Sequence, residues 1–318
     1  MIVIKPSAEI IPTNKDPMKH IEQIGRVCYK SEDRITDDSA PKFVKMINER
    51  GHWAMLENYI FIMSIPKMAY RILSEENPKY INMTEGAHGY VVSFSARSLL
   101  DLRNETESNI IIDVINTLIN NIVIEYDCRE LFSNVFRDKE VWGYEGNYQI
   151  ITMEEAMIYF TATEKLAHCW VSTKWICDRG VSHELVRHEG QMSFAQESTR
   201  YCNYTNNKFC GEVTFIQPFF WEPESAEDYK WRNCMAVCES IYKDLVAMGA
   251  QPQEARSVLP NSLKTEVCIT GRFKEWLHFF ELRTDKPAHP QMREVATPLL
   301  REFKNRWPDI FSEIEGVD

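Results

Sequence analysis

The sequence lacks several features that mark other classes of protein. It contains no Cys-x-x-Cys pair, and its nine cysteines are irregularly spaced, which favours reduced thiols over a disulfide framework or a zinc ribbon. No apolar run reaches the roughly eighteen residues that a membrane span requires. Residues 1–12 carry no basic leader and no small-residue cleavage site, so they predict a first strand and not a signal peptide. We therefore expect a cytoplasmic globular protein with no membrane partner.

An excess of basic residues is also missing. Lysine and arginine number 36 against 47 aspartates and glutamates, which gives a net charge of -11. A surface that binds nucleic acid needs the opposite balance, so we expect no nucleic-acid partner. The length of 318 residues allows one large domain or two modest ones.

Apolar periodicity predicts a helix-rich chain with short, scattered strands and no internal repeat. Strands are expected at 1–12, 59–65, near 90–94, at 212–217 and at 263–270. Helices are expected at 15–30, 38–51, 67–75, from 96 onward, and at 110–126, 225–249, 252–258, 271–283 and 289–305; residues 151–168 predict one strand followed by one helix. Runs of helices with a few separate strands predict the α+β class.

One short segment, residues 187–201, is too polar to serve packing. It combines arginines, serines and a glutamine, which are the donors that hold phosphate and carboxylate oxygens. We interpret Gly180 as the end of a preceding helix and Ser182 as the N-cap of a short helix that carries Glu184 and Arg187 as neighbours. In an acidic chain this cluster predicts a pocket for a small anion. A solvated helix end with a salt bridge is the alternative.

A zinc site is not expected in the same segment. His183 and His188 lie five residues apart, whereas the zinc-protease motif places its histidines four apart. On a helix a step of five residues turns the second side chain about 140° away from the first. The sequence therefore predicts no metal site.

A second candidate is the predicted helix at 271–283. A helical wheel places Arg272, Trp276 and Arg283 on one face and the polar residues Lys274, His278 and Glu281 on the other. A helix with two polar faces is expected to run between two ligands, or between a ligand and a neighbouring subunit. An ordinary surface helix with charge pairs is the alternative.

These motifs together resemble the flavin-dependent thymidylate synthases. That family's signature is Arg-His-Arg, a short spacer and Ser, usually followed by x-Arg-Tyr; here it reads Arg187-His188-Glu189 and then Ser198-Thr199-Arg200-Tyr201. Further matching pieces, in the same order, are Gly51-His52-x-x-x-Leu56-Glu57, Ile176 to Arg187, Ala255-Arg256-x-Val-Leu-Pro260 and His278-Phe-Phe-Glu-Leu-Arg283. The resemblance covers about 15–101 and 165–305 and implies a single catalytic domain over 1–318, with an insertion at about 103–165 and a small, mostly antiparallel sheet.

The resemblance implies a reaction and an assembly. The family transfers a methylene group from methylenetetrahydrofolate to C5 of dUMP, and FAD reduced by NADPH supplies the hydride, without a nucleophile from the enzyme. Its members are homotetramers whose active sites are shared between subunits.

The resemblance also implies roles for individual residues. Arg283 is expected to be catalytic, because a guanidinium facing the uracil ring stabilises negative charge as N3 ionises. The expected dUMP contacts are Glu184, Arg187, Gln196, Ser198, Arg200, Arg256 and Arg283. The expected FAD contacts are Glu57, Arg187, His188, Glu189, Arg272, Lys274 and His278.

Departures from the family pattern concentrate on the flavin side. Glu189 replaces the second arginine of the signature, and Arg272 and Lys274 stand where the pattern has Asn-x-Arg. A carboxylate a few Å from a pyrophosphate is repelled by about 4 kcal/mol at an effective dielectric near 20. Either Arg272 compensates for Glu189 and FAD binding is kept, or the cofactor pocket has a different role. Two alternative functions follow. One is altered C5 chemistry, such as hydroxymethylation or use of another pyrimidine nucleotide, and the other is nucleotide binding without catalysis.

Overall fold

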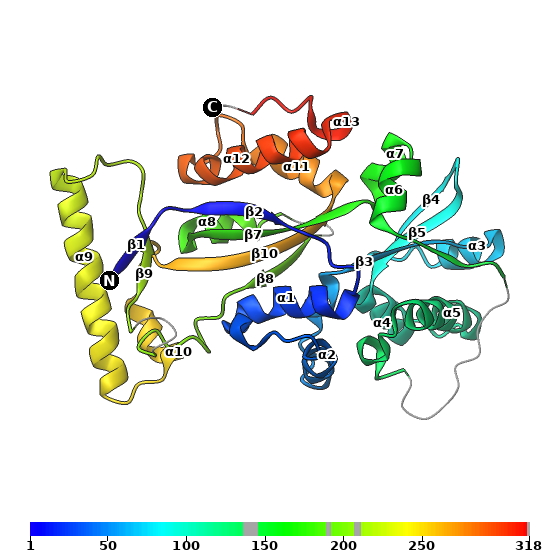
Figure 1. The fold of residues 1–318 in the computed structure, drawn as a ribbon, viewed down its shortest axis with the longest axis horizontal. Helices are drawn as coiled ribbons and strands as arrows, with labels where there is room; N and C mark the ends of the chain where they lie inside the picture. Colours follow the sequence, from blue (N-terminus) through cyan, green and yellow to red (C-terminus); the bar gives the residue numbers. More distant parts are fainter. Residues whose placement is uncertain (136–145, 189–191, 207–210, 317–318) are drawn as a thin grey trace.

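The protein has three sheets enclosed by helices, which confirms the predicted α+β class (Figure 1). The computed structural model describes residues 1–135, 146–188, 192–206 and 211–316. The strands are β1 (Ile2–Ile4), β2 (Ser7–Ile11), β3 (Ile60–Ser64), β4 (Asn82–Gly86), β5 (Gly89–Ser95), β6 (Gln149–Ile151), β7 (Trp170–Asp178), β8 (Ser193–Gln196), β9 (Thr214–Ile216) and β10 (Lys264–Arg272). The α-helices are α1 (Pro17–Tyr29), α2 (Ala40–Glu49), α3 (Lys67–Glu75), α4 (Ala96–Glu105), α5 (Asn109–Tyr126), α6 (Met153–Tyr159), α7 (Ala162–His168), α8 (Arg179–Leu185), α9 (Ala226–Ala247), α10 (Pro252–Ala255), α11 (Phe273–Arg283), α12 (Pro290–Arg306) and α13 (Pro308–Phe311).

The central sheet has the order β2-β7-β10-β8, and each neighbouring pair is antiparallel. β10 pairs with the whole of β7, from Lys264 opposite Asp178 to Arg272 opposite Trp170, while β8 lies along its other edge. Helices α11 and α12 lie over one face of this sheet and α1 lies over the other (Figure 1). Because helices cover both faces, nearly every residue of β10 is buried.

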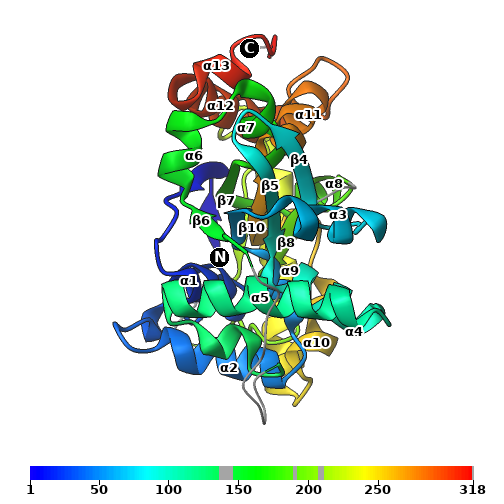
Figure 2. The same cartoon turned by 90° about the vertical axis from the view of Figure 1, so that its right-hand side faces the viewer.

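A second antiparallel sheet has the order β4-β5-β3-β6, with α3, α4 and α5 beside it (Figure 2). The segment at 103–165 supplies α5 and the edge strand β6. Ile111, Leu118 and Ile122 of α5 belong to the same buried cluster as the strands of both four-stranded sheets. The segment is therefore part of the main core, and its origin as an insertion stays a prediction.

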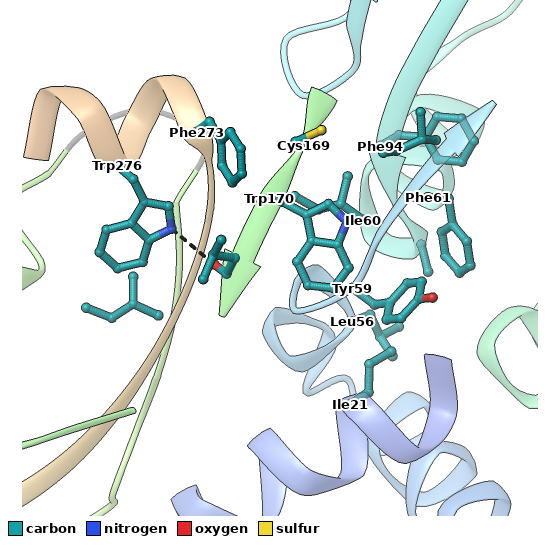
Figure 3. Packing of buried hydrophobic residues seen from close by; sticks show 14 of the residues in the cluster. Ile21, Leu56, Tyr59, Ile60, Phe61, Phe94, Cys169, Trp170, Phe273 and Trp276 are labelled. Carbon is teal, nitrogen blue, oxygen red and sulfur yellow. Dashed lines mark hydrogen bonds between the residues drawn. The ribbon is translucent and has the colours of Figure 1, made fainter. Parts of the chain in front are cut away.

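Trp170 packs where the two larger sheets meet (Figure 3). Its ring lies 5.1 Å from the ring of Tyr59 and 5.4 Å from that of His20, both edge-on. On the other side of β7, Trp276 of α11 is fully buried and donates its indole N–H to the main-chain oxygen of Val171 at 3.1 Å. One continuous core therefore joins α11, the central sheet and the second sheet.

Helix α9 packs on a smaller core at the edge of the molecule (Figure 1). Its residues Trp231, Met235 and Tyr242 are buried against the parallel pair β1–β9. Of the described helices, not one is long and apolar enough to cross a membrane. The cysteines in the described ranges form no disulfide with one another, and most of them are buried.

Most predicted helices and strands are confirmed, but the segment before Gly180 was interpreted wrongly. Residues 170–178 form β7 and not a helix, because tryptophan, valine, threonine and isoleucine favour a buried strand. The helix that follows begins at Arg179, with Asp178 as its N-cap accepting from the Val181 N–H at 2.7 Å. Gly180 and Ser182 therefore lie inside α8, and neither ends or begins a helix.

Three further elements differ from the prediction. Residues 153–168 form two helices, α6 and α7, because Thr152 and Thr161 each begin a capping box with a glutamate three residues later. The short strands β4 and β8 were not predicted, since their sequences show little apolar alternation.

Candidate active site

Arg283, at the end of α11, is held by two groups near the end of α8. Its Nε–H donates to Nε2 of His188 at 2.7 Å, and its terminal nitrogens donate to Oε2 of Glu184 at 3.3 Å and to the Glu184 main-chain oxygen at 3.1 Å. The His188 ring is buried and lies 4.7 Å from the Phe279 ring. Burial, together with the positive charge of Arg283, lowers the pKa of His188 to about 4. The imidazole is therefore neutral at pH 7 and accepts the hydrogen bond that orients the guanidinium.

The expected pairing of Glu184 with Arg187 is wrong. The side chain of Glu184 bonds Arg283, whereas Arg187 contacts Glu184 only through its main-chain N–H. The reason is that α8 ends at Leu185, so the helical spacing between the two residues is not maintained. The Arg187 side chain is exposed.

Gln196, the last residue of β8, connects this strand to α8 and to β10. Its amide nitrogen donates to Ser182 Oγ at 3.0 Å and to Thr265 Oγ1 at 3.2 Å. These bonds fix the end of β8 beside the helix that carries Glu184. Gln196 and Glu184, two expected dUMP contacts, are therefore placed on adjoining elements.

Three further expected dUMP contacts meet just beyond β8. The Ser198 N–H donates to the Cys28 main-chain oxygen at 3.1 Å, which fixes the turn against the end of α1. Arg256 donates from Nη1 to Thr199 Oγ1 at 2.8 Å. Arg200 is exposed, with its guanidinium 5.6 Å from the centre of the Tyr201 ring. Within the described ranges, neither Arg200 nor Arg256 forms an ion pair with a carboxylate, so both retain donors for an anion.

A buried network of charged side chains contacts the start of this turn. Glu266 of β10 contacts the ammonium groups of Lys30 and Lys264, and Lys174 lies 2.8 Å from its Oε2. Lys264 also contacts Glu197 at 2.9 Å, directly before Ser198. Burial alone raises the pKa of Glu266, but the charges of Lys264 and Lys30 outweigh it and hold the pKa at about 2.

This network predicts acid sensitivity of the fold. Because the pKa of Glu266 lies below the ordinary value of 4.5, the unfolded chain binds the proton more readily, and the stabilisation is lost as pH falls from 4.5 towards 2. We expect Glu266→Gln to lower stability at pH 7 and to flatten the acid branch of the unfolding free energy measured in urea. Glu302→Gln, in an exposed pair with Arg306, should keep the wild-type slope. Parallel acid branches in wild-type and Glu266→Gln proteins would contradict this assignment.

A cavity of about 220 Å³ opens at the other end of β8. It is lined by hydroxyl and charged groups with a few apolar walls, namely Glu57, Ile60, Tyr80, Ser95, Arg97, Ser98, Asp101, Met192, Ser193 and Arg272. Arg97 bridges Glu57 at 2.7 Å and Asp101 at 3.1 Å. Burial raises the pKa of Glu57, and the Arg97 charge opposes this.

Arg272 forms a charged part of the cavity wall. The residue is only 2% exposed; its Nε donates to Ser93 Oγ at 3.3 Å and its Nη2 to the Ser93 main-chain oxygen at 3.1 Å. Burial lowers the pKa of Arg272 to about 10, so the guanidinium remains charged at neutral pH. Two of the expected FAD contacts, Glu57 and Arg272, thus share one cavity.

The predicted helix with two polar faces is wrong. Arg272 is the last residue of β10 and precedes α11, so a helical wheel does not describe its position. Trp276 is buried in the core, whereas Lys274 and His278 are exposed on the outer side of α11. Neither of the two expected FAD contacts on this helix is among the residues that line the cavity. Glu189 lies outside the described residues.

Strand β8 connects the three groups of residues. Ser193 lines the cavity, Gln196 contacts α8, and Ser198 begins the turn that carries Arg200. At about 3.3 Å per residue, an extended chain from position 193 to position 198 spans roughly 17 Å. No role was predicted from the sequence for Asp101, although its spacing from Arg97 on α4 is that of a helical ion pair. In the described ranges there is no group of three His, Cys, Asp or Glu side chains that could hold a metal ion.

Part of the chain is similar to known proteins. Residues 155–309 match the family of thymidylate synthase complementing proteins. This segment includes β7, α8, β8, β10 and α11. Individual relatives are flavin-dependent thymidylate synthases. Those of Pyrococcus furiosus and Geobacter sulfurreducens are 35% and 33% identical over 130 and 135 residues, which cover 41% and 42% of this chain and 52% and 56% of theirs. That of Corynebacterium glutamicum is 28% identical over 152 residues, covering 43% of this chain and 58% of its own. The chain thus spans about half the length of the curated relatives it matches.

Proposed function

We propose that the protein is a flavin-dependent thymidylate synthase. It transfers the methylene of methylenetetrahydrofolate to C5 of dUMP, C5 loses its proton, and a hydride taken from NADPH completes the methyl group, which leaves tetrahydrofolate and NADP⁺. The observation that supports this most directly is the contact of Arg283 with neutral His188 and with Glu184, inside the segment that matches the family.

Arg283 is the proposed catalytic residue. A guanidinium has five N–H donors, and the bonds to His188 and Glu184 engage three of them, which leaves two for a ligand. An arginine keeps its charge while neighbouring groups ionise, so it stabilises the uracil ring as N3 loses its proton. The neutral imidazole of His188 and the main-chain oxygen of Glu184 orient the guanidinium for this contact.

We place the dUMP phosphate at the turn that follows β8. Ser198, Arg200 and Arg256 supply hydroxyl and guanidinium donors there, which suit a phosphate dianion. Gln196 and Glu184 then lie between this turn and Arg283, where the sugar and base would extend. Arg187, exposed near the same helix end, completes the proposed substrate contacts.

The cavity beside Ser193 suits part of FAD. Its serine hydroxyls and Arg272 match donors that a diphosphate and ribose require, while Arg97 is paired with the Glu57 and Asp101 carboxylates of the same cavity. FAD, when bound, would accept a hydride from NADPH and deliver it to the new methyl group. At about 220 Å³ the cavity is smaller than the roughly 300–1,000 Å³ of a typical ligand pocket, so it holds only a portion of the cofactor.

The remaining cofactor contacts are proposed to meet across subunits. Lys274 and His278 are exposed on α11, and the His278 ring lies 6.3 Å from the buried His188 ring. A homotetramer with shared sites would bring a neighbouring chain to this surface. Arg187, His188 and Glu189 complete the proposed FAD contacts.

A titration with FAD tests the cofactor assignment. We expect the purified protein to take up FAD with a shifted flavin absorbance band, to bleach when NADPH is added, and to regain the band when dUMP and methylenetetrahydrofolate follow. A protein that remains colourless at saturating FAD would contradict the proposal. It would favour a nucleotide-binding protein without flavin chemistry.

Altered C5 chemistry is a second candidate function. The observation in its favour is Arg272, a buried cation in the cavity wall where the family pattern has asparagine. Flavin uptake without reoxidation by dUMP and methylenetetrahydrofolate would favour this alternative.

A further inference from the structure

Arg272 is the first member of a buried hydrogen-bond relay that crosses between the two larger sheets. From β5, Ser93 accepts from Arg272 Nε at 3.3 Å, and its hydroxyl lies 2.8 Å from Nδ1 of His168 at the end of α7. Nε2 of His168 lies 2.7 Å from Thr84 Oγ1 on β4. Ser93 and His168 are fully buried, and Arg272 is nearly so. Four elements, β4, β5, α7 and the end of β10, therefore converge behind the cavity.

Only the first bond of the relay has a fixed direction. Arginine can only donate, so the Ser93 oxygen accepts from Arg272, and its own proton is free to go to His168. We assign that proton to the bond with His168 Nδ1, which is then an unprotonated acceptor. In this tautomer Nε2 carries the ring proton and donates to Thr84. A doubly protonated imidazole would reverse the bond with Ser93 and place a second positive charge beside Arg272.

The surroundings keep His168 in this state. Burial, and after it the charge of Arg272, lowers the pKa of His168 to about 4, while Glu164 acts weakly in the opposite direction. The ring of Phe160 lies 6.0 Å away and excludes water on one side. The imidazole is therefore neutral at pH 7.

Stability alone does not account for this arrangement. A buried charge loses its hydration, and replacing such polar groups with apolar residues of similar volume is often neutral or stabilising. Here a serine and a histidine are both engaged in holding one guanidinium at a cavity wall. Burying the charged Arg272 side chain costs hydration free energy, and a ligand that binds the guanidinium would account for that cost.

We propose that Ser93 and His168 are positioning residues that hold the Arg272 guanidinium against the bound flavin cofactor. The inference rests on the proposed function, because it takes the cavity to be the cofactor site. Its ligand chemistry is specific: Arg272 meets an anionic or carbonyl oxygen of the cofactor, and the relay sets the angle at which it does so.

A double-mutant cycle on FAD affinity tests the coupling. We expect Ser93→Ala to weaken FAD binding about 10-fold, as the loss of one hydrogen bond to a charged group does. In an Arg272→Asn background the same change should alter affinity by under about twofold, because the residue that Ser93 positions is absent. Ser262→Ala is the control. Ser262 does not line the cavity, and its hydroxyl accepts a hydrogen bond from the Trp231 indole at 3.2 Å, so this change should leave FAD affinity unchanged in both backgrounds. Equal losses for Ser93→Ala in the two backgrounds, or no loss in either, would overturn the proposal.

A second measurement is independent of flavin. Nitrogen NMR of histidine-labelled wild-type protein at pH 7 should show His168 neutral and protonated on Nε2. A ring protonated on Nδ1, or on both nitrogens, would overturn the relay. If the wild-type protein bound no FAD while His168 showed the expected tautomer, the proposed function would fail and the relay itself would stand.

Discussion

Replacing Arg283 with alanine is expected to lower kcat for the proposed dUMP methylation by about 100- to 1,000-fold, the usual loss when one pre-organised donor to a developing anion is removed. The reason is that Arg283, oriented by His188 and Glu184, is the proposed partner of the ionising uracil ring. Because the contact strengthens as charge develops, kcat should fall far more than KM rises. Steady-state rates of NADPH oxidation at saturating dUMP measure this effect.

Two variants make the Arg283 result specific. Arg306→Ala removes an arginine from an exposed helical ion pair with Glu302 and should leave kcat unchanged. Arg283→Lys keeps the charge but not the planar fork, so its kcat should also be low. An Arg283→Ala protein that is folded by circular dichroism and retains wild-type kcat would show that another group carries the proposed role.

Replacing Arg200 with alanine is expected to weaken dUMP binding by roughly 10- to 150-fold, because a guanidinium bound to a phosphate contributes about 1.5–3 kcal/mol. Arg200 is exposed beside Ser198 and stacks on Tyr201, so its loss should cost little folding stability. Calorimetry with dUMP and with deoxyuridine separates the loss of the phosphate contact from a change in the rest of the binding site. The affinity for deoxyuridine, which has no phosphate, should be the same in wild-type and variant proteins. Unchanged dUMP affinity would refute the placement of the phosphate.

The periodic parts of the fold could be predicted from the sequence. Helices α1, α5 and α9 carry regular apolar stripes, and their predicted limits agree with the structure to within a few residues. The buried strand β7 could not be told from a helix, because a continuously buried run has no alternation of polar and apolar residues. Short edge strands such as β8 leave even less of a pattern.

The site was less predictable, because its contacts join positions far apart in the chain. Arg283 meets His188 across 95 positions, and Arg272 meets Ser93 across 179. The resemblance grouped Arg283 and Glu184 with the same ligand, and the structure places them in contact. No local pattern indicated that Arg272 closes a strand or that His168 lies behind it. The roles assigned to all of these residues stay predictions.

The most direct test of the account is the mass of the nucleotide product. Incubated with dUMP, methylenetetrahydrofolate, NADPH and FAD, the protein should convert dUMP to a nucleotide heavier by one CH₂ group and identical to dTMP in fragmentation. Omitting FAD or NADPH should stop its formation. A product that carries an added hydroxymethyl group, or dUMP that keeps its C5 proton after prolonged incubation, would contradict the proposed thymidylate synthase activity.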